Sequence, residues 1–166
     1  MADSPYEVVD TLLYTQLTGF TDLTDVVPSR RIVFEMIDES AQEFTSPIEN
    51  SPTIKITPAN VTPEIFQSAD TSNDPMLWDI AILVPGRNYA ELRQIQYQVR
   101  RALSFFQDWK GPTGSAISVA NQGAPFKMGA GKITGFQFVR EEDQLTCVIT
   151  YRVNLTASEA EIQADT

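Results

Sequence analysis

The sequence predicts an α+β fold, with a mainly antiparallel β-sheet packed against two α-helices in a single domain. Two segments, one near the N-terminus and one in the middle, have the apolar spacing of amphipathic helices. Between and after them lie short alternating runs separated by turn residues, which is typical of hairpin-linked strands. The length of 166 residues suits one domain. We expect this domain to cover residues 1–156 and a flexible polar tail to follow at 157–166.

The first helix is predicted at residues 5–18. Ser4 and Glu7 stand where the two partners of a capping box belong, with proline at the first helical position. Apolar residues then recur with helical rhythm, at Val9, Leu13 and Leu17. Gly19 follows as a natural stop.

The next part of the chain is predicted to hold short strands and loops. Residues 31–35 are typical of a short strand, and 38–43 of a loop or a short helical turn. Residues 53–57 alternate between two prolines, which favours a short strand and is compatible with a place at a sheet edge. Residues 60–75 are rich in turn formers and are expected to be a mobile loop. A strand is predicted at 76–84.

The second helix is the clearest element of the sequence. Asn88 is the expected N-cap, and the helix should end before Gly111. Its apolar positions form one continuous stripe, made of Tyr89, Leu92, Ile95, Val99, Leu103 and Phe106. The arginines of this segment fall off the stripe.

Three strands are predicted to close the domain, at residues 116–120, 128–140 and 145–155. The glycines of 128–140 indicate a bend or a bulge. In 145–155 the residues with odd numbers are apolar, so one face of that strand should be buried. Residues 141–144 form the turn of the last hairpin.

The composition favours binding over catalysis. The chain has no histidine and one cysteine, Cys147, which removes Ser-His and Cys-His nucleophile pairs and almost every structural zinc site. We interpret Cys147 as a small buried hydrophobe. No apolar run is long enough to span a bilayer, so we expect no membrane association.

The charges are divided unevenly along the chain, whose net charge is −10. Residues 1–84 contain 14 acids and 3 bases, whereas residues 85–110 contain 5 bases and 2 acids. The acidic half would repel phosphate, so a groove for grasping nucleic acid is not expected. An acidic solvated surface is one interpretation. The other is an acidic patch that meets the basic stretch of a second copy.

Carboxylate pairs, calcium ligands and a phosphate loop were the other chemical possibilities. Acid pairs occur at Asp22 and Asp25, at 38–39, and at Asp70 and Asp74, but they lie in polar loops. Residues 70–74 lack the glycine and distal glutamate of an EF-hand. The segment 129–135 lacks the Walker spacing and precedes a strand. We therefore expect no catalytic residue, no metal site and no cofactor.

The residues most suited to contacts between subunits are basic, acidic and aromatic. Arginine forks bind carboxylates, and tryptophan is enriched at interfaces, although core packing of tryptophan is the commoner case. Basic and acidic patches on one molecule make a heterologous contact that can close into a ring. The candidate interface residues are Arg87, Arg93, Arg100, Arg101, Trp78, Asp70 and Asp74.

The chain resembles the tail-terminator family of tailed bacteriophages, which cap the tail tube and join it to the head-side connector. Three parts carry the likeness: the capped helix at 4–17, the strand-to-helix passage from Trp78 through Asn88 to Leu103, and the closing hairpin with residues 145–153. Together they cover most of the chain.

The resemblance implies a ring-forming structural virion protein with no enzyme activity. The ring would commonly be a hexamer, bound to the tail tube protein and to the head-side connector or stopper. DNA would pass through its acidic lumen without specific binding. Its location would be the virion neck, after assembly in the host cytoplasm. The alternatives are another head-tail connector or tail-completion protein, and a small non-viral adaptor or ligand-binding domain.

Overall fold

The computed structural model describes residues 4–35, 47–59, 71–107, 127–129 and 131–164. Its α-helices are α1 (Pro5–Gly19), α2 (Thr21–Thr24), α3 (Tyr89–Gln107) and α4 (Glu159–Ala164). Two single 3₁₀ turns are η1 (Ser29–Arg31) and η3 (Ile48–Asn50). The strands are β1 (Ile32–Phe34), β2 (Thr53–Ala59), β3 (Thr71–Pro85), β4 (Lys127–Met128), β5 (Lys132–Arg140) and β6 (Gln144–Ser158).

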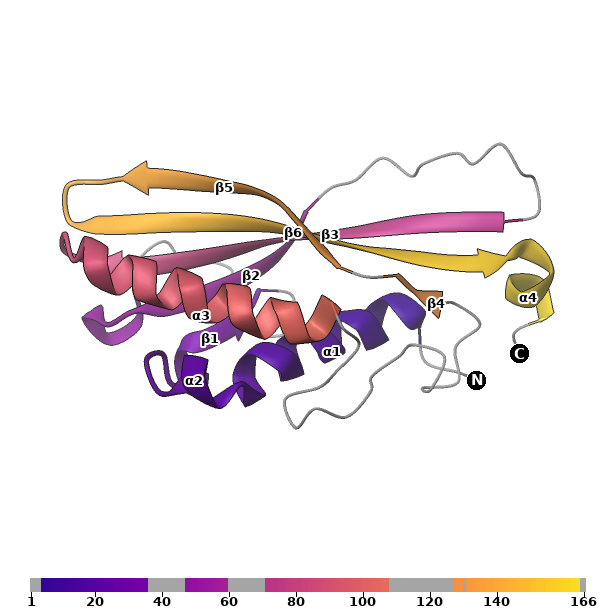
Figure 1. Cartoon of the computed structure of the whole chain (residues 1–166), viewed down its shortest axis with the longest axis horizontal. Coiled ribbons are helices and arrows are strands. Elements are labelled where there is room, and N and C mark those ends of the chain that lie inside the picture. Colours follow the sequence, from indigo (N-terminus) through magenta and orange to yellow (C-terminus); the bar gives the residue numbers. More distant parts are fainter. Residues whose placement is uncertain (1–3, 36–46, 60–70, 108–126, 130, 165–166) are drawn as a thin grey trace.

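These strands form one mixed sheet in the order β1-β2-β3-β6, with β4 and β5 both paired to the far side of β6 (Figure 1). The β1–β2 pair is parallel, and every other pair in the described sheet is antiparallel. The predicted α+β class, with its mainly antiparallel sheet and two principal helices, is therefore confirmed.

A ribbon of two long strands forms the centre of the sheet. Strands β3 and β6 pair over 15 consecutive positions, from Thr71 opposite Ser158 to Pro85 opposite Gln144. Strand β2 covers only the part of β3 from Leu77 to Leu83. Both ends of the ribbon thus extend beyond the strand on one side.

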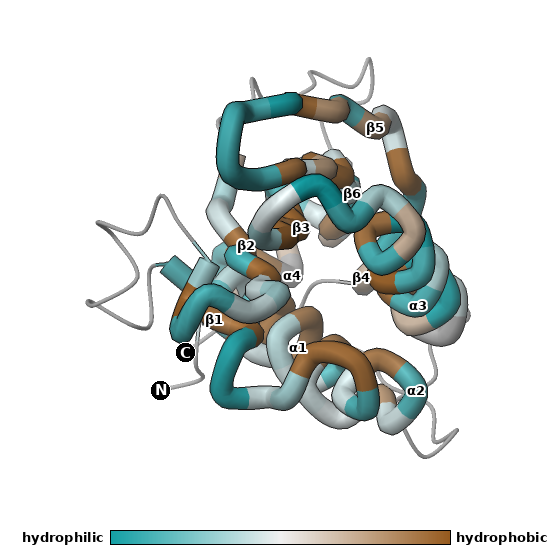
Figure 2. Tube along the Cα trace, turned by 90° about the vertical axis from the view of Figure 1, so that its left-hand side faces the viewer, coloured by the Kyte–Doolittle hydropathy of each residue, from teal (hydrophilic) through white to brown (hydrophobic). Residues whose placement is uncertain are grey.

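Helices α1, α2 and α3 lie together on one face of the sheet (Figures 1 and 2). The core fills the space between this face and α1 and α3. Its largest fully buried side chains are Trp78, Tyr151, Phe34, Leu13, Leu17, Leu23, Ile32, Ile54, Ile56, Ile80 and Ile82. Burial of such side chains is the main favourable contribution to folding.

The structure confirms two apolar patterns that the sequence predicts, one on α3 and one on β6. On α3, the stripe positions Leu92, Ile95, Val99 and Leu103 are buried. On β6, the residues with odd numbers from Leu145 to Leu155 are all buried, and the turn before them closes with a bond from Glu141 N to Gln144 O of 3.0 Å. A bulge in β5 between Ile133 and Gly135 agrees with the bend expected from the glycines.

Several boundaries differ from expectation. The Ser4 side chain makes no capping hydrogen bond; its carbonyl instead accepts the N–H of Val8 at 3.0 Å. Strand β2 is not an edge strand, because β1 pairs with it opposite β3. Residues 71–75 belong to β3 rather than to a loop, because the end of β6 supplies a partner for each of them.

The ends of the predicted last strands differ as well. The expected strand 128–140 is divided into β4 and β5. The segment expected to be a flexible tail has regular structure through Ala164, as the end of β6 and α4, and Ile162 of α4 packs against the core. The predictions for residues 38–43, 60–70 and 116–120 lie outside the described residues.

Candidate functional site: a basic and aromatic groove

A groove with a volume of about 390 Å³ lies between the start of α3 and the end of β5. One wall comes from α3 and the turn before it, and the other comes from β5 and the start of β6. The lining residues are Arg87, Tyr89, Leu92, Arg93, Phe138, Val139, Arg140, Leu145 and Thr146. We call this the α3–β5 groove.

Local hydrogen bonds fix both walls of the groove. Asn88 caps α3: its Oδ1 accepts the N–H of Glu91 at 3.1 Å, and its Nδ2 donates to the Glu91 carboxylate at 3.0 Å. The predicted N-cap is therefore confirmed. Gly86, which has a φ of 70°, donates its N–H to the carbonyl of Asp143 at 2.7 Å. This bond joins the turn before α3 to the tip of the β5–β6 hairpin.

Arg93 is held in a defined orientation in the groove. Its guanidinium lies 4.8 Å from the ring centroid of Tyr89 and 4.2 Å from that of Phe138. Its Nε donates to the Tyr89 hydroxyl at 2.6 Å, and its Nη1 donates to Gln96 Oε1 at 2.9 Å. Nη2 has no partner among the described residues, and an arginine whose orientation is already fixed loses little side-chain freedom when it binds a carboxylate.

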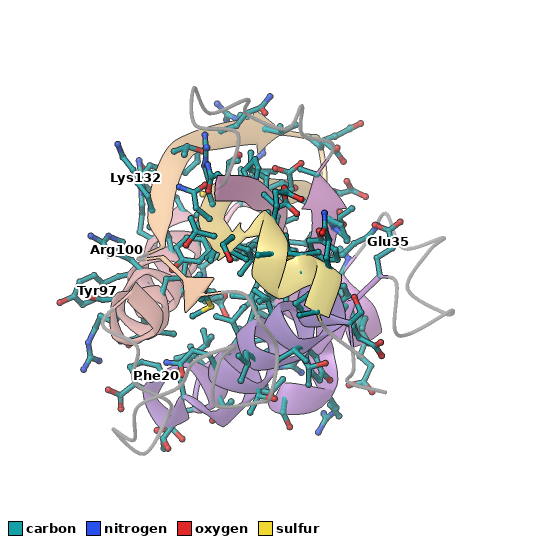
Figure 3. The ribbon with its side chains drawn as sticks, turned by 90° about the vertical axis from the view of Figure 1, so that its right-hand side faces the viewer. Phe20, Glu35, Tyr97, Arg100 and Lys132 are labelled. Atoms are coloured by element: carbon teal, nitrogen blue, oxygen red, sulfur yellow. The ribbon has the colours of Figure 1, made fainter. Side chains whose placement is uncertain are left out.

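Two further arginines of the groove have no ion-pair partner among the described residues, namely Arg87 and Arg140. The positive charge continues along the same side of the molecule. Figure 3 shows Arg100 and Tyr97 of α3 and Lys132 of β5 together on one side, with Glu35 on the opposite side. We call this side the basic flank; its cations are Arg87, Arg93, Arg100, Lys132 and Arg140.

Exposed aromatic rings accompany these cations. Phe136 and Phe138 are 48% and 44% exposed, although they lie opposite the buried residues Ile149 and Cys147 and share their face of the sheet. They remain exposed because β5 lies at the margin of the sheet, and no described strand pairs with its other edge. The order of the strands, which the sequence does not display, decides the exposure of these two rings.

The floor of the groove beneath Arg93 is apolar, and the nearby thiol of Cys147 is unreactive. Leu92 and Leu145 line it, and Cys147 is fully buried as a free cysteine, as predicted. Burial raises the pKa of Cys147 to about 11, although the positive charge of Arg93 acts in the opposite direction. At neutral pH the thiol is therefore protonated and a poor nucleophile.

The remaining arginine candidate, Arg101, is engaged within its own chain. Its Nη1 lies 2.5 Å from Oδ2 of Asp22, and its guanidinium lies 5.4 Å from the ring of Phe20. This pair links α3 to α2. Of the four arginine candidates, Arg87 and Arg93 thus meet in the groove, Arg100 lies on the same flank, and Arg101 joins two helices.

Trp78 does not lie at the surface, which corrects its place among the interface candidates. It is fully buried, stacks on Tyr151 at 6.3 Å between ring centroids, and donates Nε1–H to Asp10 Oδ1 at 2.8 Å. Asp74 accepts a hydrogen bond from the Tyr6 hydroxyl, far from the groove. Asp70 lies outside the described residues.

The described residues contain no group of three or more histidine, cysteine, aspartate or glutamate side chains able to hold a metal ion. Asp22, from one predicted acid pair, is paired with Arg101. The glycine segment near residue 130 leads into strand β5, as expected, rather than into a helix. None of the helices in the described part of the chain is both long and apolar enough to cross a membrane.

No protein-family model matches the sequence, and no curated protein matches it. One solved structure aligns with a TM-score of 0.45 and 8% sequence identity, covering 90% of this chain and 94% of that chain. A likeness at this level does not bear on function.

Proposed function

We propose that this chain is a structural subunit that associates with copies of itself into a ring at the neck of a tailed bacteriophage, where the ring caps the tail tube and docks the head-side connector. The observation that supports the proposal most is the basic flank with its exposed aromatic rings. Large exposed apolar side chains combined with arginine are typical of protein interfaces.

The charge distribution also supports association between copies. The flank holds cations that have no ion-pair partner among the residues that the structure describes, whereas residues 1–84 contain 14 of the 22 acids of the chain. A contact between unlike surfaces repeats in one sense, and it closes into a ring when the rotation per copy allows. The acids left facing the lumen would repel the DNA backbone and let DNA pass without sticking.

The test is the mass of the wild-type protein in solution, followed by imaging. Light scattering across a range of concentrations should give a single oligomer, commonly a hexamer in the family that the sequence resembles, and negative-stain images should show a ring. Because arginine–carboxylate pairs are screened by salt, about 0.5 M sodium chloride should loosen the ring.

A second readout addresses the cap. Adding the protein to polymerising tail tube protein should shorten the tubes, because a bound ring covers the growing end. Tubes of unchanged length, with no ring at either end, would contradict the proposed position of the protein at the end of the tail tube.

A second candidate function is a monomeric adaptor or ligand-binding domain. The α3–β5 groove favours it, since three arginines above an apolar floor suit a small anion that carries an apolar group. A protein that stays monomeric at all accessible concentrations and whose groove binds such an anion would favour this alternative.

A further inference from the structure

The α3–β5 groove carries positive charge and apolar side chains, and an acidic helix face lies elsewhere on the same molecule. We infer that the groove of one copy binds the outer face of α1 and α2 of the next copy. This inference rests on the proposed self-association and specifies which two surfaces meet.

The groove is suited to bind an acidic protein surface that carries small apolar groups. The fixed guanidinium of Arg93 attracts carboxylates, and so do Arg87 and Arg140, which have no ion-pair partner in the described part of the chain. Leu92, Val139 and Leu145 provide apolar lining beside them. A nucleic-acid backbone fits less well, because it has no apolar group for this lining and the chain as a whole is strongly acidic.

The outer face of α1 and α2 has the matching chemistry. Glu7, Thr11 and Thr15 follow at steps of four along α1 and are exposed, so they lie on one face of the helix. Asp25, just after α2, is exposed as well, and neither Glu7 nor Asp25 has an ion-pair partner among the described residues. Threonine side chains are short and bring methyl groups to the surface, so another wall can approach closely.

The two surfaces occupy different parts of the molecule. Figures 1 and 2 both place β5 at one side of the molecule and α1 with α2 at the other, with α3 on the way between them. Each copy can therefore use both surfaces at once, as a heterologous contact requires. The acids of the hairpin tip, Glu141, Glu142 and Asp143, follow Arg140 directly, so the incoming carboxylate is expected nearer Arg93.

The other charges on the acceptor face do not oppose the contact. Asp22 lies on this face with Arg101 bound to it, so that pair adds no net charge. The surplus carboxylates are those of Glu7 and Asp25. Their attraction to the groove should fall with added salt, as for other exposed pairs.

The experiment uses two full-length variants that each remove one half of the contact. The groove variant combines Arg93→Glu with Phe138→Ser, and the helix-face variant combines Glu7→Lys with Asp25→Lys. All four side chains are exposed, and circular dichroism with thermal unfolding confirms that each variant folds. Arg30→Glu is the control for charge reversal, since Arg30 is exposed and lies on η1, outside both the basic flank and the α1–α2 face.

Each variant alone should be monomeric in light scattering, with the midpoint concentration of assembly raised by about 30-fold or more, the loss typical of an interface hot spot. An equimolar mixture should form a heterodimer, because the intact groove of one variant meets the intact helix face of the other. The Arg30→Glu control should assemble like the wild type.

The outcomes separate this inference from the proposed function. A wild-type protein that never assembles contradicts the ring and the inference with it. A wild-type ring that survives the groove variant, or the helix-face variant, overturns the inference alone. Binding of labelled single-stranded DNA that requires Arg93 and Phe138 would assign the groove to nucleic acid and also overturn it.

Discussion

The contact between Gly131 and Tyr151 yields the sharpest prediction about stability. Gly131 precedes β5 and lies against the ring of Tyr151, which is fully buried and stacked on Trp78. An alanine Cβ at position 131 would lie 3.0 Å from Cε1 of Tyr151 and closer still to its Cζ and hydroxyl. Trp78 lies beside this ring and both side chains are fully buried, so the ring has little room to move away. Gly131→Ala therefore forces either the ring or the entry to β5 to shift.

The magnitude follows from the cost of overpacking a core. Inserting a methyl group into a closed contact typically costs 1–3 kcal/mol, and overlap with several ring atoms places Gly131→Ala at about 3 kcal/mol. For a domain of this size, a loss of 1 kcal/mol lowers Tm by roughly 2–4 °C. We expect Tm to fall by roughly 6–12 °C.

Gly135→Ala, four residues further along and within β5, is the matched control. No atom lies within 4 Å of a Cβ built at Gly135, and its φ is not positive. Its effect should be near zero or slightly stabilising, because alanine restricts the unfolded chain. Urea unfolding of both variants, followed by circular dichroism, gives the two free energies of unfolding. Equal stability of the two variants would refute the reasoning.

A second background tests the proposed cause. Tyr151→Phe removes the hydroxyl but leaves Cζ in place, so it should rescue only part of the loss caused by Gly131→Ala. The double-mutant cycle isolates this coupling: the double variant should be more stable than the sum of the two single losses predicts, by less than the cost of Gly131→Ala itself.

Three further predictions concern titratable groups. Burial raises the pKa of Asp10, so the stability that this carboxyl contributes is full below its pKa in the unfolded chain and falls as pH rises through its pKa in the folded protein. At pH 7, Asp10→Asn should therefore be at least as stable as the wild type in urea. Asp10→Ala leaves the Trp78 indole N–H without its acceptor and should lose about 1–3 kcal/mol. Burial and the bond to Asp74 raise the pKa of Tyr6 from 10.0 to about 12, so the stability that Tyr6 adds should be lost as pH rises through that range, and Tyr6→Phe should show a flatter stability profile there. Cys147, with its pKa of about 11, should react with a thiol reagent at neutral pH only after unfolding; a fast reaction in the native protein would contradict its burial.

The elements that depend on residue spacing within one segment could be predicted from the sequence. The stripe of α3 from Leu92 to Leu103 and the alternation of β6 depend on spacing along one segment, so both could be predicted. Asn88 could be predicted as a cap because its partner, Glu91, lies three residues away.

Features that depend on distant pairing could not be predicted. Residues 71–75 have the composition of a loop, and only the far end of β6 makes them a strand. Pro75 lies beyond the reach of β2, which pairs only with residues 77–83, so β3 has a described partner on one side only at this position. The exposure of Phe136 and Phe138 depends on the order of the strands. The arginines of the groove could be singled out by charge, but the rings that orient Arg93 could not.

The continuous pairing of β3 with β6 makes the molecule a fixed spacer. At about 3.3 Å per residue, 15 paired positions span roughly 50 Å. A slip of one residue in the pairing would turn the buried side chains of the slipped strand toward solvent, so β3 and β6 cannot slide past each other by single residues. Whatever binds at the hairpin tip is thereby held at a set distance from whatever binds near α4, and a pull on one end is transmitted along the backbone to the other.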